Sequence, residues 1–454
     1  MIRIITTLII SLITIFTSLF AQEINGTWYG KLKTPNGNIR INFNITKVEN
    51  SYKTTMDSPD QRAFEIPTDK TNFKDNKVEI FLNNLLINYK GTCKNDSIKG
   101  TFTQNGMAFP LDLTKNKIVA ENVKARPQDP IKPFPYSSKE VTFTNVNGDK
   151  IAGTLTLPKN VKNPKVVILI SGSGPQDRNE EVKAFNHRPF LVLADYLTRN
   201  GIAVLRYDDR GVAKSKGKFK GATTLDFAND VESAVAYLKS MKNVHFSQIG
   251  LIGHSEGGLI APIVASEDKA IDFIILLAGP GIDGGKILET QKEKISELSG
   301  LSKQQITANI KLTKEIHQIV RNAKNTNEVN QQLTDYFKNK QQISNSEKQQ
   351  YIDAYSDNWL FNFVKINPQD YLAQVTCPVL VLNGSKDVQV LPKINLEAIQ
   401  KATIQNKKVT LKEIQDVNHM FQTCNTGNIN EYAKIEETIS PNVLHIIADW
   451  IKIQ

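Results

Sequence analysis

The chain has 454 residues, a formal net charge of +10 and three cysteines. At roughly 100–200 residues per domain this length predicts two or three domains, and 40% hydrophobic with 22% charged residues excludes a disordered or fibrous chain. The charge is an excess of 56 Lys and Arg over 46 Asp and Glu, without a dense basic block. Scattered lysines are typical of a solvated surface, so nucleic acid is not an expected partner.

The N-terminus carries the longest apolar run of the chain, from Ile4 to Ala21. Arg3 precedes the run and polar Gln22 follows its small last residue, which is the pattern of a secretory signal peptide over residues 1–21. An uncleaved anchor is the alternative, because the run approaches the length that spans a bilayer. We expect cleavage after Ala21 and an exported protein, periplasmic or secreted, without stable membrane insertion.

The three cysteines are too few and too scattered to predict a disulfide framework, and none has metal-ligand spacing. One bridge can form, with Cys377 and Cys424 preferred as the pair over Cys93. The sequence therefore predicts neither a metal site nor a cofactor.

Residues 22–115 predict a small antiparallel β domain, either a barrel or a sandwich. Ile39, Ile41 and Phe43 alternate with polar residues, which is the period of a half-buried strand. No cluster of histidines, cysteines or paired acids in this segment resembles a site. A structural or positioning role is expected, with ligand or glycan binding as the alternative.

After a proline-rich linker at residues 116–140, where the prolines exclude a helix, the pattern changes to alternating strands and helices over residues 141–454. Near-continuous apolar runs alternating with helical stretches predict a parallel sheet buried on both faces. The runs are Val166–Ile170, Ile202–Tyr207, Ile249–Ile252, Ile271–Leu277, Val379–Leu382 and Val409–Ile414. Residues 281–370 interrupt them with polar sequence at helical spacing, which predicts a helical insertion at the C-terminal edge of the sheet.

One motif in this region predicts nucleophilic chemistry. Gly253-His254-Ser255-Glu256-Gly257 matches the pattern G-x-S-x-G. The pattern is weak alone, but a buried strand precedes it and an apolar helix follows. That strand–turn–helix setting exposes a serine hydroxyl on a strained turn above the sheet. A glycine-rich loop without chemistry is the alternative.

A serine nucleophile needs a base, and the base needs an acid, in the order Ser, Asp or Glu, His. His419, in the loop after the last apolar run, is the candidate base, whereas His445 lies in a helical pattern and is expected to pack. Asp387 follows Val379–Leu382 at the C-terminal edge and is the candidate acid. Asp416 is the reserve, although it lies too close in sequence to His419.

Two main-chain N–H groups have to bind the oxyanion. Glu256, which follows the nucleophile, supplies one, and the small-residue loop after Val166–Ile170 supplies the other through Ser173 or Gly172. A phosphate-cradling loop is the alternative, but no Lys-Ser or Lys-Thr pair follows.

Two further groups are expected beside this site. The charged residues of the run Asp208-Asp209-Arg210 are expected to brace the neighbouring loop, since buried charges need partners. Three aromatic residues close the insertion and either line an acyl pocket or only pack: Trp359, Phe361 and Phe363.

These residues together resemble the α/β-hydrolase superfamily over residues 141–454, and more narrowly exported bacterial multidomain serine esterases with a β-rich N-terminal domain. The resemblance is carried by Ser171–Arg178, Tyr207–Gly211, Gly253–Gly258, Asn383–Asp387 and Asn418–Phe421. Most relatives have His-Gly where this chain has Ser171-Gly172, a change that leaves a main-chain donor in place.

The resemblance implies an α/β-hydrolase sheet with a helical cap and the hydrolysis of small carboxylic esters, usually with short acyl chains. A serine peptidase of the prolyl peptidase or aminopeptidase type is the alternative, because that superfamily shares similar motifs. A binder that grips cell-envelope glycan through the β domain is a further alternative, and the complete set of candidate catalytic residues argues against it.

Overall fold

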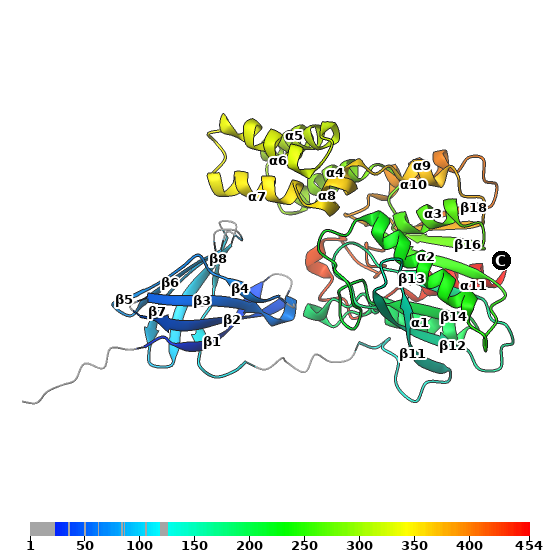
Figure 1. The fold of residues 1–454 in the computed structure, drawn as a ribbon, viewed down its shortest axis with the longest axis horizontal. Coiled ribbons are helices and arrows are strands. Elements are labelled where there is room, and N and C mark those ends of the chain that lie inside the picture. The colour runs from blue at the N-terminus through cyan, green and yellow to red at the C-terminus, as the bar shows by residue number, and fades with distance from the viewer. Residues whose placement is uncertain are drawn as a thin grey trace, which may run out of the picture. The chain divides into compact units, whose positions relative to one another are not determined.

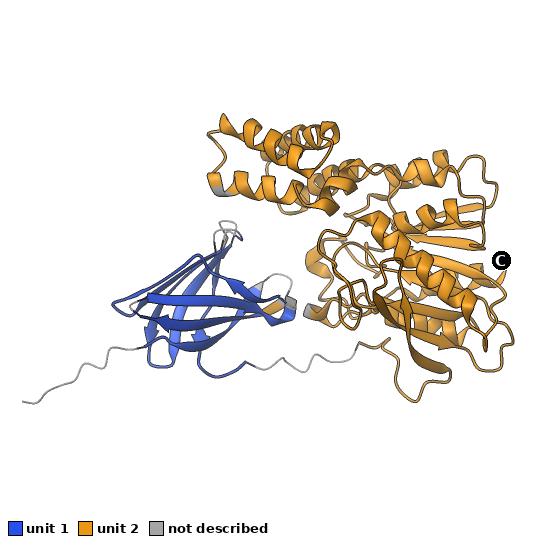
Figure 2. Cartoon of the chain, in the orientation of Figure 1, with its two compact units in different colours: residues 1–33, 40–118 blue, residues 34–39, 119–454 orange. Residues whose placement is uncertain are grey.

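The computed structural model describes residues 23–34, 37–49, 51–61, 63–82, 85, 87–104, 107–118 and 126–454. The chain forms two compact units, residues 1–33 with 40–118 and residues 34–39 with 119–454 (Figure 2). The predicted signal peptide, residues 1–21, lies outside the described residues. Within the described part of the chain, no helix is long and apolar enough to cross a membrane.

The first unit is an antiparallel β half-barrel (Figure 1), which confirms the predicted small all-β domain. Its strands are β1 (Gly26–Thr34), β2 (Gly37–Val48), β3 (Ser51–Ser58), β4 (Ala63–Pro67), β5 (Lys70–Lys74), β6 (Lys77–Leu82), β7 (Ile87–Lys94), β8 (Ser97–Gln104), β9 (Met107–Pro110) and β10 (Leu113–Thr114). They pair in the order β4-β3-β2-β1-β10-β8-β7-β6-β5, and β9 pairs with β8. Trp28, Phe43, Tyr89 and Phe102 are buried in its core.

The second unit is built on a sheet that is parallel over most of its width. Its strands are β11 (Ser137–Thr144), β12 (Lys150–Leu157), β13 (Val166–Ile170), β14 (Ala203–Tyr207), β15 (Ile249–His254), β16 (Phe273–Leu277), β17 (Val379–Gly384) and β18 (Val409–Ile414). Across residues 126–454 they pair in the order β11-β12-β14-β13-β15-β16-β17-β18. The hairpin β11–β12 joins β14 antiparallel, and β13 to β18 pair in parallel.

Every residue of β13 to β17 is buried, as predicted for parallel strands with helices on both faces. The same prediction for Val409–Ile414 is wrong, because β18 has a neighbouring strand on one side only and is half exposed. An edge strand keeps solvent on its free side, and its polar residues Lys412 and Glu413 are exposed.

Helices cover both faces of the sheet, and the alternation of side chains along each strand fills both interfaces. The helices outside the insertion are α1 (Pro189–Arg199), α2 (Thr224–Ser240), α3 (Gly257–Glu267), α10 (Pro392–Ala402) and α11 (Pro441–Lys452). In β13, Val166 and Ile168 belong to one core cluster with buried residues of α2, α3 and α10, whereas Val167 and Leu169 belong to another with buried residues of α1 and α11.

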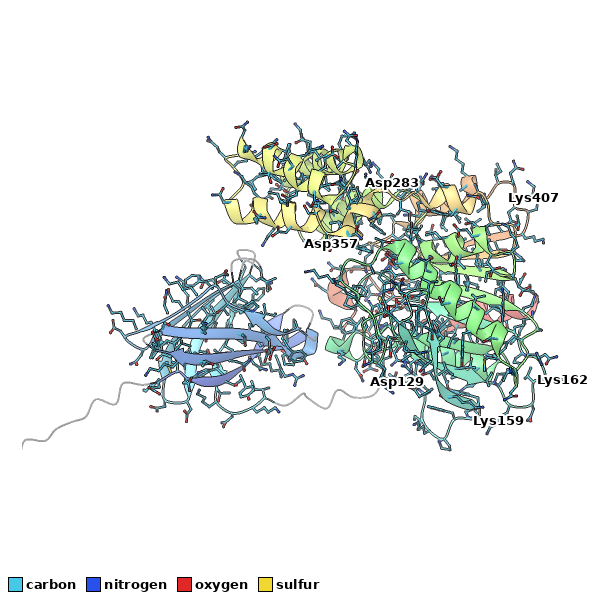
Figure 3. The ribbon with its side chains drawn as sticks, in the orientation of Figure 1. Asp129, Lys159, Lys162, Asp283, Asp357 and Lys407 are labelled. Carbon is cyan, nitrogen blue, oxygen red and sulfur yellow. The ribbon has the colours of Figure 1, made fainter. Side chains whose placement is uncertain are left out.

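The predicted helical insertion lies between β16 and β17. It comprises α4 (Gly284–Leu298), α5 (Lys303–Asn322), α6 (Thr326–Lys338), α7 (Asn345–Tyr355), α8 (Asn358–Lys365) and α9 (Pro368–Leu372). Asp283 and Asp357, labelled in Figure 3, accept main-chain hydrogen bonds at the N-termini of α4 and α8. A separate cluster that includes Ile316, Leu333 and Phe337 gives α4–α8, the cap, a core of its own.

The second half of the expected linker packs on the α/β unit. The Arg126 guanidinium donates to the main-chain carbonyls of Phe185, Ile435 and Glu437, and the Gln128 amide donates to that of Ile439. These partners lie up to 311 residues away in sequence, which composition alone does not reveal.

All three cysteines are free thiols, so the Cys377–Cys424 bridge that the sequence left open is not formed. Cys377 lies before the first residue of β17, whereas Cys424 follows the loop that leaves β18 and its N–H binds the Asp416 carbonyl. The two thiols therefore belong to opposite ends of parallel strands.

Candidate active site

Ser255 lies on the turn between β15 and α3 in a strained conformation. Its φ of 54° is in the left-handed region, which a serine adopts only where the surroundings enforce it. Its N–H donates to the Leu277 carbonyl at 2.9 Å, which fastens the turn to β16. A Cβ on Gly253 would lie 1.9 Å from the Gly257 carbonyl oxygen, and one on Gly257 would lie 2.1 Å from that of Ile170. Both glycines are therefore required by close backbone approach, as the motif predicts.

His419 and Asp387 form a buried pair at the C-terminal edge of the sheet. His419 Nδ1 and Asp387 Oδ2 are 2.8 Å apart, and the two residues are 4% and 2% exposed. Asp387 Oδ1 accepts the N–H groups of Gln389 at 2.8 Å and Val390 at 2.9 Å, which fix the carboxylate. A carboxylate at Nδ1 selects the tautomer that leaves Nε2 as a proton acceptor.

The loops that carry these two side chains are bonded to each other. The Lys386 N–H donates to the Val417 carbonyl at 3.0 Å, and the Asp416 N–H donates to the Ser385 hydroxyl at 2.9 Å. A Cβ on Gly384 would lie 2.1 Å from the Val417 carbonyl oxygen, so β17 must end on a glycine. The Asp416 carboxylate is 65% exposed and pairs with Lys386, which removes it as the acid for His419.

His445, the other late histidine, lies on α11 with a side chain that is 70% exposed, close to Asp449. The expectation that it packs is wrong, because it falls on the solvent side of the helix, whose buried residues include Leu444 and Ile447.

Ser255 and His419 line one cavity of about 270 Å³. Beside them, the core contributes Gly172, Ser173, Gln176, Glu180, Val182, His254, Glu256, Pro280, Gln389, Val390 and Met420. The cap contributes Ile287, Leu288, Gln291, Trp359 and Phe363. Of the three aromatic residues singled out in the sequence, Trp359 and Phe363 therefore line the cavity, and Phe361 belongs to the cap's own core.

In the loop Ser171–Arg178, called the oxyanion loop below, the main-chain N–H groups of the two predicted donors have different partners. The Gly172 N–H already donates to Glu180 Oε1 at 2.9 Å. The Ser173 N–H is bound to no other described residue and lies on the cavity. Glu256 stands at the N-terminal end of α3, where N–H groups lack partners within the helix. Ser173 and Glu256 thus remain the candidate donors, whereas the Gly172 N–H is already engaged.

Asp209 braces the oxyanion loop as predicted. Its two carboxylate oxygens accept from the Ser171 hydroxyl at 3.0 Å and from the Gln176 N–H at 2.9 Å. Burial raises the pKa of Asp209 well above its ordinary value, although these hydrogen bonds oppose the shift.

Asp208 braces the end of the same loop through Arg178. The two side chains make hydrogen bonds of 3.0 and 2.7 Å, and these hold the pKa of Asp208 below its usual value although burial opposes the shift. Arg210, the third residue of the run, instead pairs with Asp230 on α2 at 2.7 Å. The predicted bracing role therefore holds for the two aspartates.

The structure also shows two contacts that the sequence did not indicate. Glu256 Oε1 accepts from the Thr224 hydroxyl at 2.7 Å and from Trp359 Nε1 at 2.9 Å, which ties the cap to the turn that carries Ser255. Glu180 pairs with His254, whose ring also contacts the His419 loop. The only sequence signal for this second pair is that His254 belongs to the motif.

Within the described ranges, no group of three or more His, Cys, Asp or Glu side chains could hold a metal ion. The chemistry that the arrangement supports is nucleophilic attack by a serine hydroxyl with an imidazole as base.

Comparison with known families agrees with this geometry. The family model for serine aminopeptidase, S33, matches residues 186–423, which is more than half of the chain. The chain belongs to this family. The matched range of the S33 model contains Ser255, Asp387 and His419, and the α/β-hydrolase fold predicted from the sequence is confirmed.

Esterases are among the relatives of this S33 protein. Esterase EstD of Thermotoga maritima is 25% identical over 324 residues, which cover 71% of this chain and 69% of EstD. The structure of the Pyrococcus furiosus esterase Pf2001 is 17% identical with a TM-score of 0.43, over 70% of this chain and 92% of that one. Est1E from Butyrivibrio proteoclasticus, with ferulic acid bound, is 18% identical with a TM-score of 0.42, over 69% and 99%. Family and fold identify the protein as a hydrolase.

Proposed function

We propose that the protein is a serine carboxylesterase in which Ser255, His419 and Asp387 form the catalytic triad. The observation that carries the proposal is the shared cavity. Ser255, on its strained turn, and His419, with Asp387 2.8 Å from its Nδ1, line the same space. The esterase relative EstD supports the ester as substrate.

The proposed reaction is acyl transfer to water through an acyl-enzyme. The Ser255 hydroxyl attacks the ester carbonyl while His419 Nε2 takes the hydroxyl proton, and the imidazolium then gives that proton to the leaving alcohol. Asp387 orients the imidazole and stabilises its charge, and the amides of Glu256 and Ser173 bind the tetrahedral oxyanion. A water molecule, with its proton taken by His419, releases the acid and restores the serine.

The cavity supports short acyl chains. Its volume of about 270 Å³ lies just below the ~300–1,000 Å³ of typical small-molecule sites. Apolar side chains of the cap, among them Leu288 and Phe363, line it opposite the catalytic residues. An acetyl or butyryl group therefore suits the space better than a long chain.

Hydrolysis of p-nitrophenyl acetate and butyrate tests the proposal. Wild type is expected to turn over both esters, and Ser255→Ala is expected to lose the activity while keeping the wild-type melting temperature. Equal turnover by the two proteins would refute the assignment of Ser255.

A serine peptidase is the second candidate, because the matched family is described as a serine aminopeptidase. A panel of aminoacyl and prolyl amides, assayed beside the esters, separates the two functions. Amide turnover that exceeds ester turnover in kcat/KM would favour the peptidase.

We also propose that the protein is exported. The apolar run that ends at Ala21 supports a signal peptide, and N-terminal sequencing of the protein from periplasm or medium is expected to begin at Gln22. A chain that retains residues 1–21 would support the anchor instead.

A further inference from the structure

A second carboxylate–imidazole pair lies beside the His419–Asp387 pair. Glu180 Oε1 is 2.8 Å from His254 Nδ1, and the ring centroids of His254 and His419 are 4.9 Å apart. Glu180 is 4% exposed and His254 is 6% exposed. The mechanism above assigns no role to either residue, so a buried charged pair next to the base remains to be explained.

The pair connects three segments that carry the proposed machinery. Glu180 Oε1 accepts the N–H of Gly172, the neighbour of Ser173 in the oxyanion loop, at 2.9 Å. His254 occupies the position before Ser255 on the strained turn. His254 Nε2 lies 3.0 Å from the main-chain carbonyl oxygen of His419.

The hydrogen bonds fix the protons on this pair. A carbonyl oxygen only accepts, so His254 Nε2 must carry a proton. Glu180 Oε1 also accepts from the Gly172 N–H. Opposite an ionised Glu180, the 2.8 Å contact at Nδ1 needs a second ring proton, and His254 is then an imidazolium. Burial opposes this charge, but the Glu180 carboxylate raises the pKa of His254 above its ordinary value.

The surroundings of His254 agree with that charge state. Four titratable groups of the described chain face it from the neighbouring segments: Glu180, His419, Asp387 and His187. Asp387 also favours a positive His254. His187 adds no charge, because burial lowers its pKa to about 3.

We propose that Glu180 and His254 are positioning residues for the hydrolysis, which hold the oxyanion loop, the turn carrying Ser255 and the loop carrying His419 in one arrangement. This inference rests on the proposed function. A displacement of about 1 Å between nucleophile, base and oxyanion donors costs on the order of a hundredfold in rate. Two side chains that bond to all three segments prevent that displacement.

Steady-state kinetics on p-nitrophenyl butyrate, for three Glu180 variants and one control variant in the cap, test this role. In Glu180→Ala, which removes the bonds to Gly172 and His254, kcat is expected to fall about a hundredfold with little change in KM. Glu180→Gln keeps an acceptor oxygen for Gly172 but no negative charge for His254, and it is expected to recover part of that loss. Glu180→Asp keeps the charge but shortens the side chain, and it is expected to lie between Ala and wild type.

The cap provides a matched control. Glu289 Oε1 is 2.9 Å from His317 Nδ1, and both side chains are buried, but neither lines the cavity. Glu289→Ala therefore removes a carboxylate from a buried histidine just as Glu180→Ala does. We expect Glu289→Ala to lower the melting temperature and to leave kcat at the wild-type value.

The pH dependence of kcat/KM in Glu180→Ala distinguishes a positioning role of Glu180 from an effect of its charge. In Glu180→Ala the Nδ1 proton of His254 leaves with the carboxylate, so the net charge beside His419 is unchanged. The acid limb of kcat/KM is therefore expected to keep its midpoint while kcat falls at every pH. A displaced midpoint, or a Gln variant as slow as the Ala variant, would show that Glu180 acts through its charge and would overturn the proposal.

Three other results would also overturn it: wild-type kcat in Glu180→Ala or Glu180→Asp, a loss confined to KM, or an equal loss of kcat in Glu289→Ala. If Glu180→Ala does not fold, the Asp and Gln variants decide by the same criteria. Ser255→Ala keeps this test distinct from that of the function. Full turnover in Ser255→Ala rejects the esterase mechanism itself, whereas an inactive Ser255→Ala with a fully active Glu180→Ala rejects only the positioning role.

Discussion

The floor and the roof of the cavity are built by different physical means. The floor consists of the core loops after β13, β15, β16, β17 and β18, and the roof consists of the cap helices α4 and α8. In the floor, main-chain hydrogen bonds, buried ion pairs and crowded glycines such as Gly253 fix every functional group. The roof instead offers apolar side chains from helices. From this difference we expect the floor to determine the reaction and the roof to select the substrate.

Hydrogen bonds join the roof to the core. Trp359 Nε1 donates to the Glu256 carboxylate at 2.9 Å, and the Gln291 amide donates to Gln389 Oε1 at 3.2 Å. Outside the floor, the Asn358 amide donates to the Gly221 carbonyl at 2.7 Å. The cap also has its own hydrophobic core. Substitutions on its cavity side can therefore change the available space while the floor keeps its geometry.

The largest effect on kcat is expected when the candidate acid is removed from the floor. Asp387→Asn is expected to lower kcat about 10⁴-fold, because the amide favours the wrong tautomer of the base. Asp416→Asn is the matched control, since Asp416 lies near His419 in sequence but pairs with Lys386. Ester kinetics measure both, and an equal loss in the control would contradict the assignment of the acid.

Two phenylalanines allow the cavity side of the roof and its internal core to be tested separately. Phe363→Ala enlarges the cavity and is expected to raise the ratio of kcat/KM for octanoate to that for butyrate by about tenfold or more. Phe361→Ala makes the same change in the cap core and is expected to cost about 3–5 kcal/mol of stability without altering that ratio. If both variants shift chain-length preference alike, the cavity side of the cap does not select the substrate.

The core and the roof hold their buried histidines differently. His317 of the roof has Glu289, whereas His187 binds the Thr438 carbonyl at 2.9 Å and has no carboxylate partner among the described residues. Burial lowers the pKa of His187 to about 3, and the unfolded chain takes up its proton below about pH 6.5. Its contribution to stability is therefore complete above that pH and is lost as the pH falls towards the folded pKa.

The resulting slope is up to ~1.4 kcal/mol of unfolding free energy per pH unit. His187→Gln keeps a donor for Thr438 and is expected to flatten the slope. Urea unfolding of both proteins between about pH 4 and 7 measures it. Parallel pH dependences would show that His187 does not contribute to acid sensitivity.

The floor was largely predictable from the sequence because its signals are local. Ser255 lies between a buried strand and an apolar helix, and Asp387 and His419 follow strands whose apolar runs are clear. The roof was predictable only as helices. Helical spacing does not say which face meets the cavity, so Phe361 and Phe363 could not be told apart until the cap was placed on the core.

Long-range pairings were the part of the floor that the sequence did not predict. The Glu180–His254 pair joins residues 74 positions apart, and the same Glu180 carboxylate engages the Gly172 N–H that the sequence offered as an oxyanion donor. The exposure of β18 likewise follows from its place at the edge of the sheet, which its own residues do not specify.

Identification of the nucleophile tests the central claim most directly. A fluorophosphonate probe, followed by intact-mass and peptide mass spectrometry, reports which residue reacts and whether hydrolysis stops with it. We predict a single adduct on Ser255, loss of ester turnover in proportion to labelling, and no adduct in Ser255→Ala. An adduct on another residue, or full ester turnover by completely labelled protein, would contradict the account.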